Sequence, residues 1–189
     1  LKILSNNKLK SNKNILNTIL KRRSKNILKK ISYRIKVFSS RIKGEKFNTP
    51  SLFRKIFLEI VLIKNIIKWK FISQPINKNK KFKVLYPLQF QPEQNIDVWG
   101  YPYNNQTNLI KKISKTLKNK NIEIYIKLNP LTKYELSKEM IKLIVSNDNL
   151  IPLEPKYQMS DIINKVDLVI TVTGSILFEC VTNKKPIIS

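Results

Sequence analysis

The chain has 189 residues, of which 42% are hydrophobic, and carries a formal net charge of +25. This length suffices for one domain with a sizeable core. The absence of histidine and the single cysteine, Cys180, exclude histidine-based general base catalysis and an internal disulfide, and they argue against a zinc site.

The positive charge is concentrated in the first part of the chain. Residues 1–80 hold 22 of the 37 basic residues and 2 of the 12 acidic ones. We therefore divide the chain into a basic helical segment, 1–80, and a second domain, 81–189. A lone cysteine and the lack of a signal peptide favour the cytoplasm. Because the chain begins at Leu1 and stops at Ser189, directly after a strand-like Pro-Ile-Ile, we expect a fragment whose second domain is incomplete.

Helices are predicted in the basic segment. Apolar residues between 15 and 42 recur at three-, four- and seven-residue steps, which is typical of one or two amphipathic helices. Ser51 is a suitable N-cap for a helix over 52–72, and Pro75 would follow its end. That helix should place on one side Leu52, Ile56, Ile60, Ile63 and Ile67. The Lys- and Asn-rich stretch 77–81 is predicted to be a solvated linker.

Three interpretations of residues 15–72 remain open. Their lysines can form a solvated helical face, a basic surface on anionic lipid, or a nucleic-acid contact. Specific nucleic-acid binding is disfavoured, since arginine is scarce and no known nucleic-acid-binding motif is present. A peripheral position on the inner face of the cytoplasmic membrane would follow from the second interpretation.

From Phe82 onward, strand and helix patterns alternate. Strands are predicted over 82–88, 122–128, 150–153, 167–171 and 186–188, with helices over 104–118, 134–146, 159–164 and 176–181. The connections are too long for hairpins, so the pattern indicates an α/β domain with a Rossmann-like parallel sheet. Such sheets bind ligands at the carboxyl ends of their strands.

One strand–turn–helix unit, over 166–186, suits an anion. Thr173, Gly174 and Ser175 form a small polar turn before the helix, and Glu179 lies one helical turn after Ser175. Free N–H groups and hydroxyls there could bind a phosphate, while the carboxylate could accept hydrogen bonds from a ribose. The alternative is an ordinary turn with a Ser or Thr N-cap.

Two further polar clusters, 89–95 and 127–130, follow the first and second predicted strands. In a parallel sheet these clusters and the turn at 171–175 should meet at one edge. Lys127 could offset phosphate charge there, or it could be a solvated lysine. No Asp-x-Asp motif is present, which favours chemistry without a metal.

Three motifs carry a resemblance to a known family. In order and spacing, P-L-Q-F-Q-P-E (87–93), K-L-N-P (127–130) and T-V-T-G-S-I-L-F-E-C-V-T-N-K-K-P (171–186) resemble bacterial capsular polysaccharide biosynthesis proteins. That family includes transferases of 3-deoxy-manno-octulosonate (Kdo). The resemblance covers roughly residues 82–189.

The resemblance implies a GT-B-type glycosyltransferase, of which this segment would be the C-terminal, donor-binding half. Its donor would be a nucleotide sugar, with CMP-Kdo as a candidate, and its acceptor a glycan or lipid-linked glycan. By carry-over, the implied donor-binding residues are Gln91, Lys127, Asn129, Thr173, Gly174, Ser175 and Glu179. The family's histidine is replaced by Asn129, which cannot carry a positive charge or transfer a proton at neutral pH.

The loop at 89–103 contains further candidates. Glu93 could act as a base or contact a sugar, or it could be a plain loop carboxylate. Trp99, Tyr101 and Tyr103 could stack on a ring, although packing of the loop onto the sheet is the simpler expectation.

The sequence thus favours a metal-independent glycosyltransferase of surface polysaccharide assembly. A degenerate, non-catalytic domain that binds nucleotides or polyanions is the alternative, and Asn129 favours it. A sugar-nucleotide epimerase shares the fold but lacks a recognisable proton-transfer pair here.

Overall fold

The structure, a computed structural model, describes residues 32, 33, 35, 36, 39, 52–133 and 135–189. It separates into two compact units, Leu1–Ile63 and Lys64–Ser189. The helices predicted over 15–42 lie outside the described residues, apart from five positions that are helical. The division at residue 80 and the membrane contact through 15–72 stay predictions.

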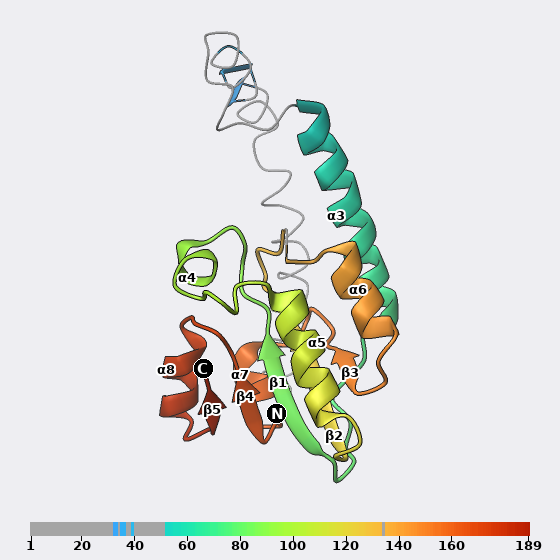
Figure 1. The fold of residues 1–189 in the computed structure, drawn as a ribbon, viewed down its shortest axis with the longest axis vertical. Coiled ribbons are helices and arrows are strands. Elements are labelled where there is room, and N and C mark those ends of the chain that lie inside the picture. The colour runs from blue at the N-terminus through green and yellow to red at the C-terminus, as the bar shows by residue number, and fades with distance from the viewer. Residues whose placement is uncertain (1–31, 34, 37–38, 40–51, 134) are drawn as a thin grey trace, which may run out of the picture. The chain divides into compact units, whose positions relative to one another are not determined.

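The second unit contains a five-stranded parallel sheet (Figure 1). Its strands are β1 (Phe82–Pro87), β2 (Ile122–Lys127), β3 (Leu150–Pro152), β4 (Leu168–Ile170) and β5 (Ile187–Ile188), in the order β3-β2-β1-β4-β5. This is the order of the first five strands of the Rossmann fold. The α/β, Rossmann-like prediction is confirmed, and each predicted strand is present with slightly shorter bounds.

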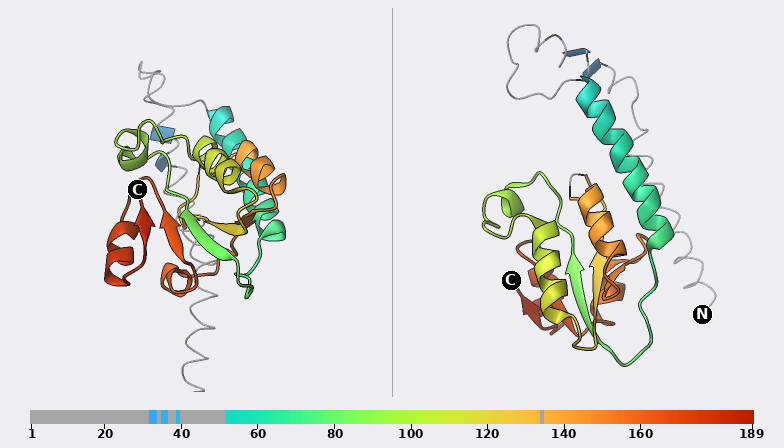
Figure 2. Two further views of the ribbon diagram at one scale, coloured as in Figure 1. Left: turned by 60° about the horizontal axis from the view of Figure 1, so that its bottom comes forward. Right: turned by 45° about the vertical axis from the view of Figure 1, so that its right-hand side comes forward.

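Helices cover both faces of this sheet (Figure 2). The helices α5 (Gln106–Leu117) and α6 (Lys138–Val145) contact each other on one face. On the other face, α7 (Met159–Ile163) and α8 (Ile176–Thr182) contribute to one hydrophobic cluster with β1, β2 and β4. A short helix, α4 (Gln94–Asp97), interrupts the predicted loop at 89–103.

The strands are buried on both sides, as expected for a sheet between two helical layers. Leu85, Tyr125 and Val169 lie in the cluster on the α7–α8 side, together with Ile162 and Cys180. Cys180 is a buried, free thiol, as its apolar surroundings in the sequence indicated. Since side chains alternate along a strand, the neighbouring residues face α5 and α6.

The last part of α3 (Leu52–Ile72) belongs to the sheet unit, and it buries a different face from the one predicted. Ile67, on the predicted apolar side, is 49% exposed, whereas Asn65 and Trp69 are buried. Asn65 Nδ2 donates to the Leu136 carbonyl at 2.8 Å, and Trp69 Nε1 donates to the Leu153 carbonyl at 2.9 Å. The inward face is therefore formed by Leu62, Asn65 and Trp69, and not by the isoleucines.

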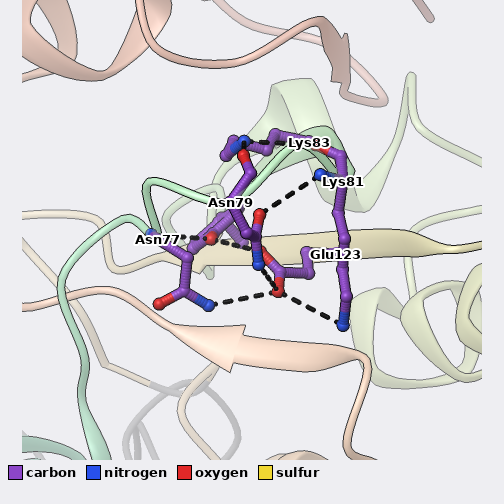
Figure 3. Close-up of polar contacts among 6 residues, drawn as sticks. Asn77, Asn79, Lys81, Lys83 and Glu123 are labelled. Carbon is purple, nitrogen blue, oxygen red and sulfur yellow. Dashed lines mark hydrogen bonds and ion pairs between the residues drawn. The ribbon is translucent and has the colours of Figure 1, made fainter.

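The linker at 77–81 is fastened to the amino end of the sheet (Figure 3). Asn77 and Asn79 donate to Glu123 Oε1 at 3.1 and 2.7 Å, and Lys81 lies 3.6 Å from the same oxygen. Burial acts to raise the pKa of Glu123, but hydrogen bonds from Tyr125, Asn79 and Asn77 outweigh it and lower the pKa. The linker is largely exposed, as predicted, but its two asparagines are also hydrogen-bonded to the sheet, which the sequence pattern did not indicate.

No described helix combines the length and the apolarity needed to cross a membrane.

Candidate functional site

The predicted site residues lie at the carboxyl edge of the sheet. Pro87 and Lys127 are register partners at the ends of β1 and β2. Leu85 pairs with Tyr125 and Val169, so Thr171, two residues after Val169, lies level with Lys127 on the same face. With β1 between them, the two backbones are separated by about 10 Å. The structure therefore brings the ends of β1, β2 and β4 together, as predicted.

Gln89 joins the end of β1 to the turn after β4. Its Nε2 donates to Thr171 Oγ1 at 2.9 Å and to the Thr173 carbonyl, while its Oε1 accepts from Thr173 Oγ1 at 2.6 Å. Thr171 Oγ1 in turn donates to the Thr173 carbonyl at 2.8 Å. The hydroxyl of Thr173, a predicted ligand-binding group, is therefore committed to holding the turn. Gln89 belonged to the expected polar cluster, but its bridging role depends on contacts across 82 and 84 residues.

Beyond this bridge, the turn presents exposed polar groups. Gly174 has φ +103°, a left-handed conformation that favours glycine, and Ser175 begins α8 without a side-chain capping bond. Ser175 and Glu179 are both exposed, and the Glu179 N–H donates to the Ser175 carbonyl at 3.4 Å. Neither side chain makes a hydrogen bond or ion pair with the described residues. They stand one helical turn apart, as the spacing indicated.

Gln91, by contrast, is turned into its own loop. Its Nε2 donates to Asp97 Oδ1 at 2.5 Å and to the Asn104 carbonyl at 3.2 Å, and its Oε1 accepts from Gln106 Nε2 at 3.0 Å. The amide nitrogen of Gln91 and its carbonyl oxygen are thus both engaged by residues of the loop and of α5. In this structure Gln91 builds the loop.

The same loop packs closely against the segment after β4. A Cβ atom on Gly100 would lie 2.4 Å from the Ile96 carbonyl oxygen and 3.1 Å from a Val172 methyl.

Glu93, the predicted catalytic residue, is exposed, and its Oε1 accepts from Asn95 Nδ2 at 3.4 Å. Glu93 lies in the loop above the strand ends, and nothing in its surroundings distinguishes it from a plain loop carboxylate.

Lys127 is the most unusual member of the edge. The residue is only 7% exposed, and its ammonium makes no hydrogen bond or ion pair with the described residues but is not fully enclosed from solvent. Burial lowers the pKa of Lys127 because the charged form loses hydration. Of the two alternatives for this residue, a lysine extended into solvent does not fit its low exposure. A buried, unpaired cation is costly to a folded chain and fits an anionic ligand.

Asn129, which stands where the family has histidine, shapes the turn after β2. Its Oδ1 accepts from the Leu131 N–H at 2.8 Å, and its carbonyl accepts from the N–H and hydroxyl of Thr132 at 3.0 and 2.6 Å. The side chain is therefore half engaged in an Asx turn. Its Nδ2 makes no hydrogen bond with the described residues.

Glu135, on the loop after β2, lies beside the predicted site residue Gln91, and the sequence pattern did not single it out. It is 4% exposed, and its Oε2 accepts from the N–H groups of Gln91 and Lys133 at 3.3 and 3.0 Å. Its Oε1 is buried without a hydrogen-bond partner. Burial raises the pKa of Glu135, and the hydrogen bonds from the two backbone amides only partly oppose this. A lone glutamate in a loop carries no sequence signal of such burial.

Two surface hollows in the described part of the chain are lined by none of the predicted donor-binding residues, although Tyr103 lines one of them. One, of about 290 Å³, lies at the amino end of the sheet beside Glu123 and Asn149. The other, of about 400 Å³, lies along the outer side of α5. No group of three or more Cys, Asp or Glu side chains that could hold a metal occurs among the described residues.

Comparisons with known proteins give only distant solved structures. No family model matches the chain. No curated protein matches it either. Thermosulfurimonas dismutans KpsC, beta Kdo 2,4 transferase, is similar at 15% identity and TM-score 0.42, over 68% of this chain and 44% of that chain. Thermosulfurimonas dismutans KpsC, beta Kdo 2,7 transferase, is similar at 22% identity and TM-score 0.46, over 74% of this chain and 45% of that chain. This chain therefore spans less than half the length of either.

Proposed function

We propose that residues 82–189 are the donor-binding half of a GT-B-type glycosyltransferase of bacterial surface polysaccharide assembly. The donor is a nucleotide-activated sugar, with CMP-Kdo as the candidate, and the acceptor is a glycan or lipid-linked glycan. The observation that carries the proposal is Lys127, a buried cation without a partner among the described residues, at the ligand-binding edge of a Rossmann-like sheet. The three family-like motifs around that edge support it.

Lys127 would neutralise the donor's phosphate. As the sugar leaves, negative charge grows on the nucleotide phosphate, and a fixed ammonium in a poorly hydrated position stabilises that charge more than bulk water does. The cost of burying the lysine is incurred during folding, so no reorganisation is needed at the moment of transfer. This contribution requires neither a metal nor a histidine.

Ser175 and Glu179 would bind the other side of the nucleotide. Both side chains are exposed and make no polar contact with the described residues, so a phosphate oxygen and a ribose hydroxyl are suitable partners. Thr173 and Gln89 would act indirectly by holding the turn in place. Glu93 stays the candidate base of this segment. The basic segment would keep the protein on the inner face of the cytoplasmic membrane, close to a lipid-linked acceptor.

A binding panel tests the proposal. The full chain is titrated with CMP, UDP, GDP and ADP in a thermal-shift assay, because a ligand at 100 times its Kd stabilises the native state by about 2.7 kcal/mol. We expect one nucleotide to raise the Tm, and Ser175→Ala and Glu179→Ala each to weaken its binding. Ser160→Ala, an exposed serine of α7, is the matched control. Unchanged affinity in both site variants would refute the site.

A non-catalytic nucleotide or polyanion binder is the second candidate, and Asn129 favours it. Its Oδ1 is engaged in the turn, and an amide cannot transfer a proton. If Asn129→His binds the nucleotide equally well and gains no transfer or donor hydrolysis, the non-catalytic function is supported. A gain in turnover would favour the transferase.

A further inference from the structure

The loop between α4 and α5 exposes a group of apolar and aromatic side chains. Val98, Trp99, Tyr101 and Tyr103 are 58%, 72%, 77% and 53% exposed. The loop itself packs inward, as expected, but it does so through Ile96 and Gly100 and not through these aromatic rings. Large exposed apolar patches on a folded domain usually mark an interaction surface.

This exposure does not come from a loosely held loop. Ile96 is fully buried beneath it, and Gly100 is packed so closely against the Ile96 carbonyl that no Cβ would fit. The Tyr103 N–H donates to the Gly100 carbonyl at 2.7 Å, and the Tyr101 N–H donates to that of Val98 at 3.4 Å. The backbone is thus anchored inward while the rings are directed outward.

A basic hollow of about 400 Å³ adjoins the loop. From the loop it is lined by Pro102 and Tyr103. The rest of its lining comes from α5 and its N-cap and contains no acidic residue: Asn105, Asn108, Leu109, Lys111, Lys112 and Lys115. At 3.6 residues per turn, the three lysines fall within a sector of about 100°. Lys111 and Lys115 are one turn apart, so their ammonium groups can approach the same anionic surface.

We propose that this surface, residues 98–103 with Lys111, Lys112 and Lys115, docks on an anionic lipid bilayer. The rings of Trp99 and Tyr101 lie at the headgroup level, where aromatic side chains with one polar end are stable. The lysines face the negative headgroups, and the hollow accommodates one lipid phosphate. The inference depends neither on the proposed function nor on residues 15–72.

The acidic residues of the loop do not oppose this assignment. Asp97 accepts from the Gln91 side chain and from the Glu93 N–H at 2.8 Å, so its charge is engaged inside the loop. Glu93 is exposed, and it precedes α4, whereas residues 98–103 follow that helix. Val98 favours lipid over nucleic acid. An exposed aliphatic side chain can be buried at the bilayer interface, whereas it makes no favourable contact with a nucleic-acid phosphate backbone.

The chain's two tryptophans make the contact measurable. Trp69 is buried and hydrogen-bonded, whereas Trp99 is 72% exposed, so a change in emission on lipid binding reports on Trp99. The full chain is mixed with vesicles of phosphatidylglycerol and phosphatidylcholine in equal amounts, or of phosphatidylcholine alone. We expect a blue shift and quenching by brominated acyl chains with the anionic vesicles only. Both should disappear in Trp99→Phe.

Two charge-matched variants locate the basic contact. Lys111→Gln with Lys115→Gln removes two lysines of the hollow, and Lys118→Gln with Lys120→Gln removes two exposed lysines beyond the other end of α5. Each lysine near an anionic surface is worth about fivefold in binding. We therefore expect a loss of about 25-fold for the first pair and little change for the second.

Three results would overturn the proposal. Vesicle binding with unchanged Trp99 emission would place the contact elsewhere in the chain. Equal losses in the two lysine pairs would show unspecific charge attraction. A Trp99 shift with double-stranded DNA but none with vesicles would assign the surface to nucleic acid. In every variant, unchanged far-UV circular dichroism verifies the fold.

Discussion

Replacing Lys127 by methionine should separate stability from ligand binding. Methionine keeps the length of the side chain and removes the ammonium of a residue that is only 7% exposed and makes no hydrogen bond or ion pair with the described residues. Exchanging buried charge for apolar atoms of similar volume typically stabilises a protein by about 1–4 kcal/mol. For a domain of this size, 1 kcal/mol raises the Tm by about 2–4 °C. We expect a rise of at least about 2 °C, together with loss of nucleotide binding.

The pH dependence of this gain has a defined sign. Burial lowers the folded-state pKa of Lys127 below the ordinary 10.5, so between these two values the unfolded chain binds more protons than the native one. In that window the wild-type protein gains stability as the pH rises. The Tm difference between Lys127→Met and wild type should therefore be largest below the lowered pKa and shrink toward pH 10.5.

The assay is a thermal-unfolding series for both proteins, without and with the nucleotide that shifts the wild type most. Lys120→Met, at an exposed lysine after α5, controls for the general loss of one charge. A lower Tm for Lys127→Met would show that the ammonium is stabilising and has a partner. A higher Tm with unchanged nucleotide affinity would show that Lys127 is not part of the binding site.

Two further substitutions test the contacts around this edge. Glu135→Gln retains an acceptor for the Gln91 and Lys133 N–H groups. It should stabilise the protein at neutral pH, because the raised pKa of Glu135 makes the ionised form unfavourable in the folded state. In thermal-unfolding experiments this gain in stability should vanish below about pH 4.5. Glu135→Ala, which leaves both amides unsatisfied, should instead cost about 1–3 kcal/mol, and an equal response of the two variants would contradict this role. Trp69→Phe removes the hydrogen bond to the buried Leu153 carbonyl and should lower the free energy of unfolding by about 1–3 kcal/mol in urea titrations; no change would show that the end of α3 does not stabilise the sheet unit.

The sheet and the polar clusters at its carboxyl edge could be predicted because their signals are local. Runs such as Ile122–Lys127 are apolar and β-branched, and their spacing along the chain requires parallel crossovers. Once the sheet is parallel, its topology alone brings the polar clusters after β1, β2 and β4 to one side. No side-chain contact had to be known for that inference.

The side-chain roles could not be predicted, since they depend on partners far away in the sequence. The amide of Gln91 is turned inward by Asp97 and Gln106, and Glu135 is buried beneath the loop that carries Gln91. The inward face of α3 is determined by Asn65 and Trp69, whose acceptors lie 71 and 84 residues later. Isoleucine periodicity reports none of these contacts.

The two ends of β2 give the strongest reason to place a ligand at its carboxyl end. Glu123, Tyr125 and Lys127 share one face of the strand, and all three are buried. At the amino end, Glu123 accepts hydrogen bonds from Tyr125, Asn77 and Asn79, as buried charges normally do.

At the carboxyl end, the ammonium of Lys127 and one oxygen of Glu135 have no partner within the described residues. The same strand thus carries one buried residue whose charge is hydrogen-bonded and another whose ammonium makes no polar contact with the described residues. Folding alone would favour an apolar residue at position 127, so the retained charge points to a partner that binds after folding. Under the proposed function, a nucleotide phosphate would supply that partner.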